Sequence, residues 1–552
     1  MTEKAALKTN NKHPKGLPYL FFTEMWERFG YFLLLGIFFL YMKAPKTDGG
    51  MGYDPGRASD IFGTLIALTY LTPFIGGFIA DRKIGYIKAV YIGGALMGLG
   101  YMCFAINGMT AFYAAMALIV IGNGFFKSSM SALLGNLYAT EPFKSKKDAG
   151  FNIFYMGINF GAFICNIIAA FMRNKYGWDE AFIAAGVGMF LGLGIFTIGL
   201  KHYRAANVLK PAQKGEIGMG NLFSVGFLPA VVTGVLGWMI PDNIFGSDAT
   251  DAFIFASFPI IFFFISIYKK AEKNDKRPIA VLLAIFAMSI MFWTVFKQTG
   301  TALITWTESY TDRQVSGMAG DIAESLYLVD KVTYGKDSIP AFDNNYKLIR
   351  EKGNIVKTYD YPMYFKNMDT AKLPEEGTTI RVANPELFQS INPFWIIVLT
   401  PLVVAFFAYL RKKGKEPTTP SKIVWGMLIS ALSCLIMMAA VHYSDNGTIK
   451  VSAWWIFFYG LITVGEIFLS PMGLSLVSKL SPPRITALMM GGFFLATAIG
   501  NKLSGALAKS WYNYENKQLY FVVNFILLLV AAGIGFALLK WMNKVMKEKS
   551  LQ

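Results

Sequence analysis

Long apolar runs are the feature of this sequence that most restricts its fold. A transmembrane helix needs about 20 consecutive, mostly apolar residues. Fourteen stretches of the chain qualify, and they are 18–42, 58–80, 86–107, 111–136, 149–172, 179–200, 220–240, 252–268, 279–309, 391–410, 422–443, 452–478, 485–508 and 518–540. Because backbone polar groups inside lipid must be satisfied within the segment, these runs predict an all-α polytopic membrane protein.

Composition excludes the other classes of protein. Of the 552 residues, 54% are hydrophobic and only 16% are charged, whereas soluble chains carry about 25% charged residues. Soluble domains of about 150 residues could not bury so much apolar surface. The three cysteines, Cys103, Cys165 and Cys434, lie inside predicted spans and show no disulfide or zinc spacing. We find no catalytic or nucleotide-binding motif, so we expect neither an enzyme nor a metal or organic cofactor.

The basic residues indicate the orientation of the chain. With the N-terminus in the cytoplasm, the inner segments carry 30 Lys and Arg and the short outer loops carry eight. This asymmetry follows the positive-inside rule and predicts that both termini are cytoplasmic. The net charge of +17 is therefore a topology signal, and nucleic acid is not an expected partner.

One long polar segment, 311–390, interrupts the pattern and falls on the outer side. It holds 10 Lys and Arg against 12 Asp and Glu. Loops longer than about 15 residues are usually functional or disordered. Scattered apolar positions predict partial folding, either as a cap over the entrance or as a surface elaboration without a role in transport.

Few charges remain inside the spans. The cations are Arg28, Lys127, Lys297 and Lys502, and the acids are Glu24, Glu27 and Glu466, with Asp60 and Glu308 near span ends. A charge at the bilayer centre costs several kcal/mol, so such residues are paired or face water and often mark function.

Spacing groups three of these charges. Glu24 and Arg28 are four residues apart and share one helix face, with Glu27 beside them. Together with Lys127 they predict a cluster that responds to protons, because protonating one acid releases its cation to pair elsewhere.

Residues 76–85, GGFIADRKIG, resemble the loop signature of the major facilitator superfamily. This resemblance implies two six-helix bundles that alternate access to a central site. An extra pair of spans at 220–268 lies between the halves, as in prokaryotic proton-dependent oligopeptide transporters. The implied organisation is a cytoplasmic tail at 1–17, an N-terminal bundle at 18–200, linkers and the extra pair at 201–277, the first helix of the C-terminal bundle at 278–310, the extracytoplasmic insert at 311–390, the other five helices at 391–540 and a cytoplasmic tail at 541–552.

Five further segments narrow the resemblance to the oligopeptide transporter family, covering nearly the whole chain except the insert. Residues 24–31, EMWERFGY, are similar to the family's ExxERFxY motif. The other segments are 122–127 (GNGFFK), 151–163 (FNIFYMGINFGAF), 389–393 (QSINP) and 465–471 (GEIFLSP).

The resemblance implies proton-coupled import of di- and tripeptides, with roles for named residues. Those implied in proton coupling are Glu24, Glu27, Arg28, Lys127 and Lys297. Those implied in substrate binding are Arg28, Tyr31, Tyr70, Lys127, Asn159, Trp293, Asn392 and Glu466. Asp81 and Arg82 would belong to a gating loop. We expect a monomer in the lipid of a bacterial cytoplasmic (inner) membrane.

The sequence departs from the family pattern at Phe32, Leu35, Phe160 and Lys297. Many bacterial members carry a glutamate in place of Lys297. This lysine is either neutral or paired with an acid such as Glu466, Glu24 or Glu27. Three hypotheses stay open. The first is ordinary peptide symport, the second is a member retuned for another small substrate, such as an acidic or modified one, or with altered proton coupling, and the third is a membrane peptide receptor that does not transport.

Overall fold

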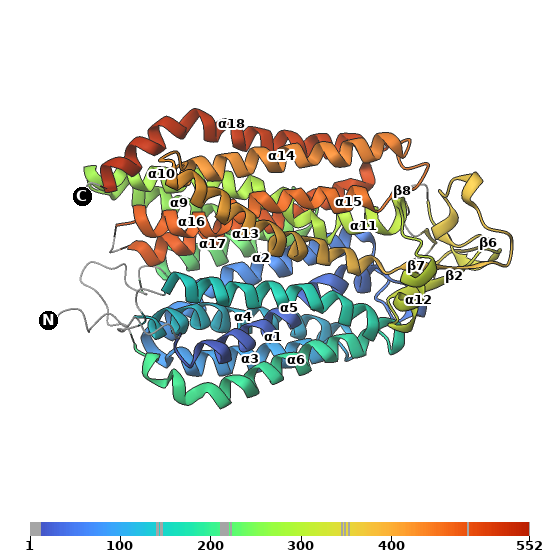
Figure 1. Ribbon diagram of the computed structural model, residues 1–552, viewed down its shortest axis with the longest axis horizontal. Coiled ribbons are helices and arrows are strands. Elements are labelled where there is room, and N and C mark those ends of the chain that lie inside the picture. The colour runs from blue at the N-terminus through green and yellow to red at the C-terminus, as the bar shows by residue number, and fades with distance from the viewer. Residues whose placement is uncertain are drawn as a thin grey trace. The chain divides into compact units, whose positions relative to one another are not determined.

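The computed structural model describes residues 13–139, 143, 147–209, 220, 223–343, 346, 349–351, 354–482 and 485–550. Residues 1–12 of the expected N-terminal tail and residues 210–219 of the expected linker lie outside these ranges. Helices dominate, in agreement with the predicted fold class (Figure 1). Up to residue 270 they are α1 (Leu17–Lys43), α2 (Pro55–Ile79), α3 (Tyr86–Cys103), α4 (Met109–Leu137), α5 (Lys147–Lys175), α6 (Trp178–Gly199), α8 (Leu228–Trp238) and α9 (Asp248–Lys270).

The later helices are α10 (Lys273–Phe296), α11 (Ala302–Tyr310), α13 (Ile391–Lys412), α14 (Thr419–Tyr443), α15 (Trp454–Tyr459), α16 (Thr463–Leu480), α17 (Thr486–Lys509) and α18 (Lys517–Ser550). Among the described residues, 11 helical segments are long and apolar enough to cross a membrane. The three other expected spans correspond to α3, α17 and a shorter apolar helix, Phe223–Trp238. The structure is therefore consistent with fourteen spans.

The chain divides into two compact units. The first unit comprises Met1–Leu35 and Leu71–Ala212, and the second comprises Gly36–Tyr70 and Gln213–Gln552. Helices α1 and α2 thus each contribute residues to both units. The division into tails, bundles and linkers that the sequence suggested stays a prediction.

Glycines bring the helices of the first unit close together. A Cβ atom added to Gly93 on α3 would lie 2.6 Å from the carbonyl oxygen of Gly122 on α4, and one added to Gly122 would lie 2.6 Å from the oxygen of Gly93. Real Cβ atoms do not come so near, so this crossing requires glycine on both helices. These glycines therefore serve helix packing.

The expected gating loop is helical. Asp81 and Arg82 lie in a single π-helical turn, Ala80–Ile84, that continues directly from α2. Gly85 ends this turn with a φ of 79°, a left-handed conformation that favours glycine. The connection between α2 and α3 is thus helical up to Gly85, and the role of Asp81 and Arg82 in gating stays a prediction.

Two predicted spans change helix type within the second unit. The span expected at 279–309 consists of α10, a 3-10 turn at Lys297–Gly300 and α11. The span expected at 452–478 consists of α15, a 3-10 turn at Gly460–Ile462 and α16. Each 3-10 turn contains a glycine, which has a low helix propensity, within an otherwise apolar run. Lys273–Tyr310 and Trp454–Leu480 each remain one candidate membrane span.

The insert between α11 and α13 is folded. Its elements are β1 (Thr311–Asp312), α12 (Gly317–Ser325), β2 (Val329–Thr333), β3 (Asp337–Pro340), β4 (Arg350–Glu351), β5 (Asn354–Ile355), β6 (Lys357–Asp360) and β7 (Thr379–Ala383). Antiparallel pairs join β2 to β7, β3 to β6 and β4 to β5. Its small core contains Tyr364, Phe365, Met368, Ile380 and Val382. Figure 1 shows these strands beyond the ends of α11 and α15, at the opposite end of the second unit from the C-terminus.

Hydrogen bonds anchor the insert to the helices beneath it. Strand β1 pairs in parallel with β8 (Val451–Ser452), which lies between α14 and α15. The Asn367 amide donates to the carbonyl oxygens of Ser309 at 3.0 Å and Gly447 at 3.1 Å. The Lys450 ammonium donates to the same Ser309 oxygen at 2.8 Å and lies 4.6 Å from the centre of the Tyr364 ring.

This anchor predicts a pH-dependent stability. Burial and, to a lesser degree, the Arg313 guanidinium lower the pKa of Lys450 to about 7, although the Asp312 and Glu308 carboxylates oppose the shift. An unfolded lysine stays protonated up to about pH 10.5. Between about pH 7 and 10.5 the unfolded state binds more protons, so the stability contribution of this site rises with pH. Below about pH 7 both states are protonated and the dependence ends.

We expect thermal unfolding to detect this effect. The difference in midpoint between the parent and Lys450→Met should shift in favour of the parent as the pH rises from 7 to 9. Lys336→Met, at an exposed position of the insert, is the matched control and should show no such trend. A parent-minus-Lys450→Met difference that is constant with pH would contradict the assignment.

Candidate functional site

A buried charge cluster lies on α1 in the first unit. The Arg28 Nη2 donates to Glu27 Oε1 at 2.6 Å, and Arg28 Nε also bonds to Glu27 Oε2. Arg28 Nε lies 3.6 Å from Glu24 Oε1, and all three residues are buried. The spacing that the sequence predicted therefore brings Glu24, Glu27 and Arg28 together on one face of α1.

The arrangement leaves one carboxylate less satisfied than the other. Among the described residues, Glu24 Oε2 is buried and has no hydrogen-bond partner. Lys127, on α4, lies close enough for its charge to act on Glu24. Arg28 is therefore held mainly by Glu27, with Glu24 farther from it. Loss of the negative charge on Glu27 would weaken the hold on Arg28 and leave it able to bind another anion.

Two other predicted residues lie in the first unit. The Arg28 Cζ lies 5.0 Å from the centre of the Tyr31 ring, and Tyr31 is buried. The Asn159 amide donates to the carbonyl oxygen of Tyr155, on its own helix α5, at 2.9 Å. A Cβ on Gly161 would lie 3.1 Å from the backbone nitrogen of Phe29, so glycine lets α5 cross α1 beside the cluster.

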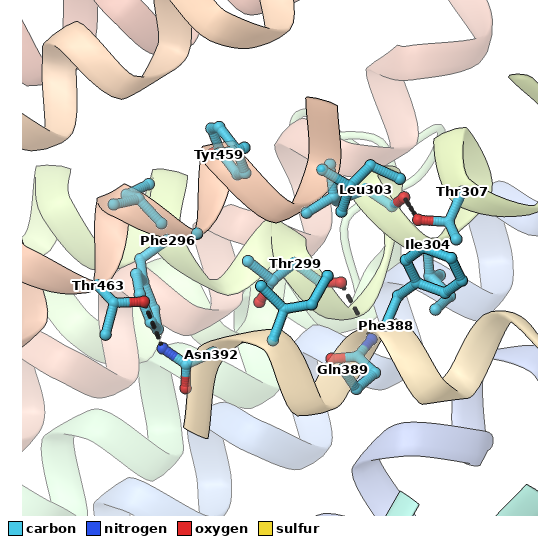
Figure 2. Close-up of a pocket in the computed structure, with 14 residues that line it drawn as sticks. Phe296, Thr299, Leu303, Ile304, Thr307, Phe388, Gln389, Asn392, Tyr459 and Thr463 are labelled. Atoms are coloured by element: carbon cyan, nitrogen blue, oxygen red, sulfur yellow. Dashed lines mark hydrogen bonds between the residues drawn. The ribbon is translucent and has the colours of Figure 1, made fainter. Parts of the chain in front are cut away.

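The second unit holds a separate polar group centred on Glu466. The Asn392 amide, at the start of α13, donates to Glu466 Oε2 at 2.9 Å and to the Thr463 hydroxyl at 3.0 Å. Figure 2 shows the Asn392 amide pointing at Thr463 on the facing helix. Asn392 therefore holds the Glu466 carboxylate in one orientation. The sequence analysis missed Thr463, although it precedes Glu466 by one helical turn.

Lys297 lies where α10 gives way to the 3-10 turn. Its Nζ is 5.4 Å from the Trp293 ring centre, 5.6 Å from that of Phe296 and 5.8 Å from that of Tyr70. Its charge acts on Glu466. The sequence left Glu466, Glu24 and Glu27 open as partners of Lys297. The structure brings Glu466 close enough for the charge of Lys297 to act on it.

A small cavity lies beside this group. Its volume is about 30 Å³, enough for about one water molecule. It is lined by residues of α10, α11, α13, α15 and α16 and of the adjacent 3-10 turns, including Thr299, Asn392 and Thr463 (Figure 2). The Gln389 amide, which also lines the cavity, donates to the Thr299 carbonyl oxygen at 3.0 Å. Polar side chains therefore line a cavity next to Asn392.

Other polar residues hold the 3-10 turn that follows α10. The Gln298 amide nitrogen donates to Asn524 Oδ1 at 3.1 Å, and Gln298 Oε1 accepts from Tyr520 and from Asn524. These bonds fix the turn Lys297–Gly300 against α18. Over the described ranges, no group of three or more His, Cys, Asp or Glu side chains is placed to hold a metal ion.

Known proteins resemble the chain over almost its full length. It is 29% identical to the "Peptide transporter YePEPT" of Yersinia enterocolitica, over 90% of this chain and 87% of that protein. It is 26% identical to "Dipeptide and tripeptide permease A" of Escherichia coli, over 90% of this chain and 84% of that protein. A crystal structure of a peptide transporter POT in complex with sulfate superposes with a TM-score of 0.75, at 29% identity over 97% of this chain and 96% of that chain.

These similarities agree with the apolar helices in indicating an integral membrane protein, and the named relatives are transporters rather than enzymes. The family model that matches the chain, over residues 87–326 and 377–523, is described as the POT family. The resemblance noted in the sequence is thereby confirmed: this protein belongs to the POT family.

Proposed function

We propose that this protein is a proton-coupled symporter that imports di- and tripeptides by alternating access. The observation that carries the proposal is the buried Arg28, held by Glu27 and Glu24 in a cluster that one proton can rearrange. The printed names of two relatives, a peptide transporter and a dipeptide and tripeptide permease, give the substrate class.

Proton binding and peptide binding share Arg28. Protonation of Glu27 or Glu24 removes one of the charges that hold the guanidinium. Arg28 and Lys127 then bind the peptide carboxylate, for which the planar guanidinium fork is well suited. Proton release restores the Arg28–Glu27 pair and expels the carboxylate.

The second unit supplies the complementary charge. Glu466, oriented by Asn392, receives the amino terminus of the peptide. Tyr31, Tyr70, Asn159 and Asn392 bond the peptide backbone, and Trp293 lines a side-chain pocket. In support, Trp293 Nε1 is buried and has no hydrogen-bond partner within the described part of the chain.

We infer the setting from charge. The excess of basic residues in the inner segments, 30 against eight in the short outer loops, supports cytoplasmic termini and an insert on the outer side. The protein acts as a monomer in the inner membrane of a bacterium, surrounded by lipid, with the proton as its coupling ion and no other cofactor.

Uptake in proteoliposomes tests the proposal. An inward proton gradient should drive accumulation of a labelled dipeptide, and unlabelled di- and tripeptides should compete with it. Failure of these peptides to compete would overturn the substrate class. Counterflow exchange separates a transporter from a peptide receptor, because a receptor does not exchange substrate across the membrane.

A retuned substrate preference is the second candidate, and Lys297 is the observation that favours it. Its charge acts on the acid that would bind the amino terminus. For ordinary peptide symport we expect Lys297→Met to keep uptake of neutral dipeptides within about threefold of the parent, because Glu466 is retained. Competition by neutral and acidic peptides measures this. A selective loss of acidic substrates in Lys297→Met would favour the retuned site instead.

A further inference from the structure

A second buried ion pair lies outside the residues that the proposed mechanism uses. The Lys502 ammonium, on α17, bonds to Asp60 Oδ1 on α2. The Lys502 side chain is 0% exposed and that of Asp60 is 10% exposed. Ionisable groups in membrane helices are expensive to bury and commonly mark a functional element. Both residues belong to the second unit.

Three elements meet at this pair. The hydroxyls of Ser247 and Thr250 donate to the two oxygens of Asp60, at 2.8 and 2.7 Å. Lys502 Nζ also donates to the Thr64 hydroxyl at 2.7 Å. Ser247 caps the N-terminus of α9, where its hydroxyl accepts from the Thr250 backbone nitrogen at 3.1 Å. The Asp60 carboxylate therefore joins α2, α17 and the positive end of the α9 dipole.

The backbones of α2 and α17 touch next to the pair. A Cβ on Gly63 would lie 3.0 Å from Gly505 Cα, and a Cβ on Gly505 would lie 2.6 Å from the Ser59 carbonyl oxygen. A glycine contact of this kind leaves no room for water at the crossing itself. The ion pair lies beside this crossing, with Lys502 fully buried and Asp60 slightly exposed, and the crossing fixes its partners.

The same segment of the chain carries another ion pair. Lys43, at the end of α1, bonds to the Glu308 carboxylate on α11. Segment 36–70 is grouped with the second unit, whereas the remainders of α1 and α2 are grouped with the first. Transporters of this kind work by rocking one helical repeat against the other. If α1 and α2 follow the first unit in that motion, segment 36–70 must leave α17 and α11 when the site opens outward.

A buried ion pair suits a contact that breaks in every cycle. Removing two charges from water costs about as much as their attraction returns, so the net stabilisation of a buried pair is small. Outward opening would admit water that solvates Asp60 and Lys502 separately. An extensive apolar contact gains nothing from hydration when it separates, so it would resist opening.

We propose that the Asp60–Lys502 pair is the latch of the external gate, and that Ser247 and Thr250 make the extra helix pair α8–α9 a working part of that gate. The proposal rests on the alternating access and orientation given under the proposed function. Opening the latch separates α2 from both α17 and the N-terminus of α9.

Thiol labelling from outside tests the latch. Ser59→Cys places a thiol on α2 at the contact with Gly505, and intact cells are treated with a membrane-impermeant maleimide. Mass spectrometry gives the labelling rate at each cysteine. We expect Asp60→Asn to raise the rate at position 59 at least tenfold and Thr250→Val to raise it severalfold. Asp60→Glu, which keeps the carboxylate, should stay closer to the parent rate than Asp60→Asn.

Two controls separate the latch from general loosening. Thr233→Val lies in the same helix pair, where its hydroxyl bonds to Pro229, Ala230 and Phe255 carbonyls, and should leave the rate unchanged. The native Cys434, buried on α14, reports unfolding. An unchanged rate at position 59 in Asp60→Asn, or an equal rise at Cys434, overturns the proposal. Labelling needs no peptide, so failure of the peptide assignment would appear in uptake alone.

Discussion

Glu27→Gln should abolish proton-driven peptide accumulation while leaving measurable counterflow exchange. Glu27 is fully buried and bonds to Arg28 through both carboxylate oxygens. Glutamine keeps the shape of the side chain but cannot gain or lose the proton. Arg28 is then held more weakly at every stage of the cycle, so peptide still binds and exchanges, but the gradient no longer drives net movement.

Uptake into proteoliposomes with and without an inward proton gradient measures this effect. We expect the gradient-dependent part to fall by about a hundredfold, the scale of a lost charged interaction of about 3 kcal/mol. Glu180→Gln, at an exposed position in the first turn of α6, is the matched control and should behave as the parent. Concentrative uptake retained by Glu27→Gln would refute the role.

Glu466→Gln should raise the KM for peptides with a free amino terminus by at least tenfold. The glutamine can still accept the hydrogen bond from Asn392, so the geometry of α13 and α16 is kept while the negative charge is lost. A charge-assisted hydrogen bond contributes about 1.5–3 kcal/mol, which corresponds to about a ten- to hundredfold change in affinity.

The N-terminus of the peptide provides the internal test. N-acetylated dipeptides should inhibit the parent and Glu466→Gln equally weakly, because they carry no ammonium group for the acid to recognise. Thr463→Val removes the other acceptor of the Asn392 amide and should have a smaller effect on KM. An unchanged KM for free dipeptides in Glu466→Gln would mean that the amino terminus binds elsewhere.

Hydropathy predicted the helices well because bilayer thickness imposes a length on each span. It could not locate the 3-10 turns at Lys297–Gly300 and Gly460–Ile462, because the apolar pattern continues through both. Nor could it show that Gly300, in the first of these turns, lies against the Phe62 ring, where a Cβ would clash. Such contacts come from residues more than 200 positions away.

Spacing along one helix predicted the cluster of Glu24, Glu27 and Arg28, since neighbours on a helix face are fixed by its period. Spacing along one helix could not identify partners on different helices. The sequence identified Lys502 and Asp60 as unusual charges but could not join them, nor place Ser247 and Thr250 beside them. Lys297 likewise had three acids as alternatives until the fold brought Glu466 near it.

The anchoring of the insert allows helix movement to be measured by spectroscopy. Its described contacts, through β1, Asn367 and Lys450, reach the ends of α11 and α14 and the short strand β8. A fluorophore or spin label at the exposed Glu376 would therefore move together with these helices. Distances from such a label could follow the transport cycle in real time without replacing any buried side chain.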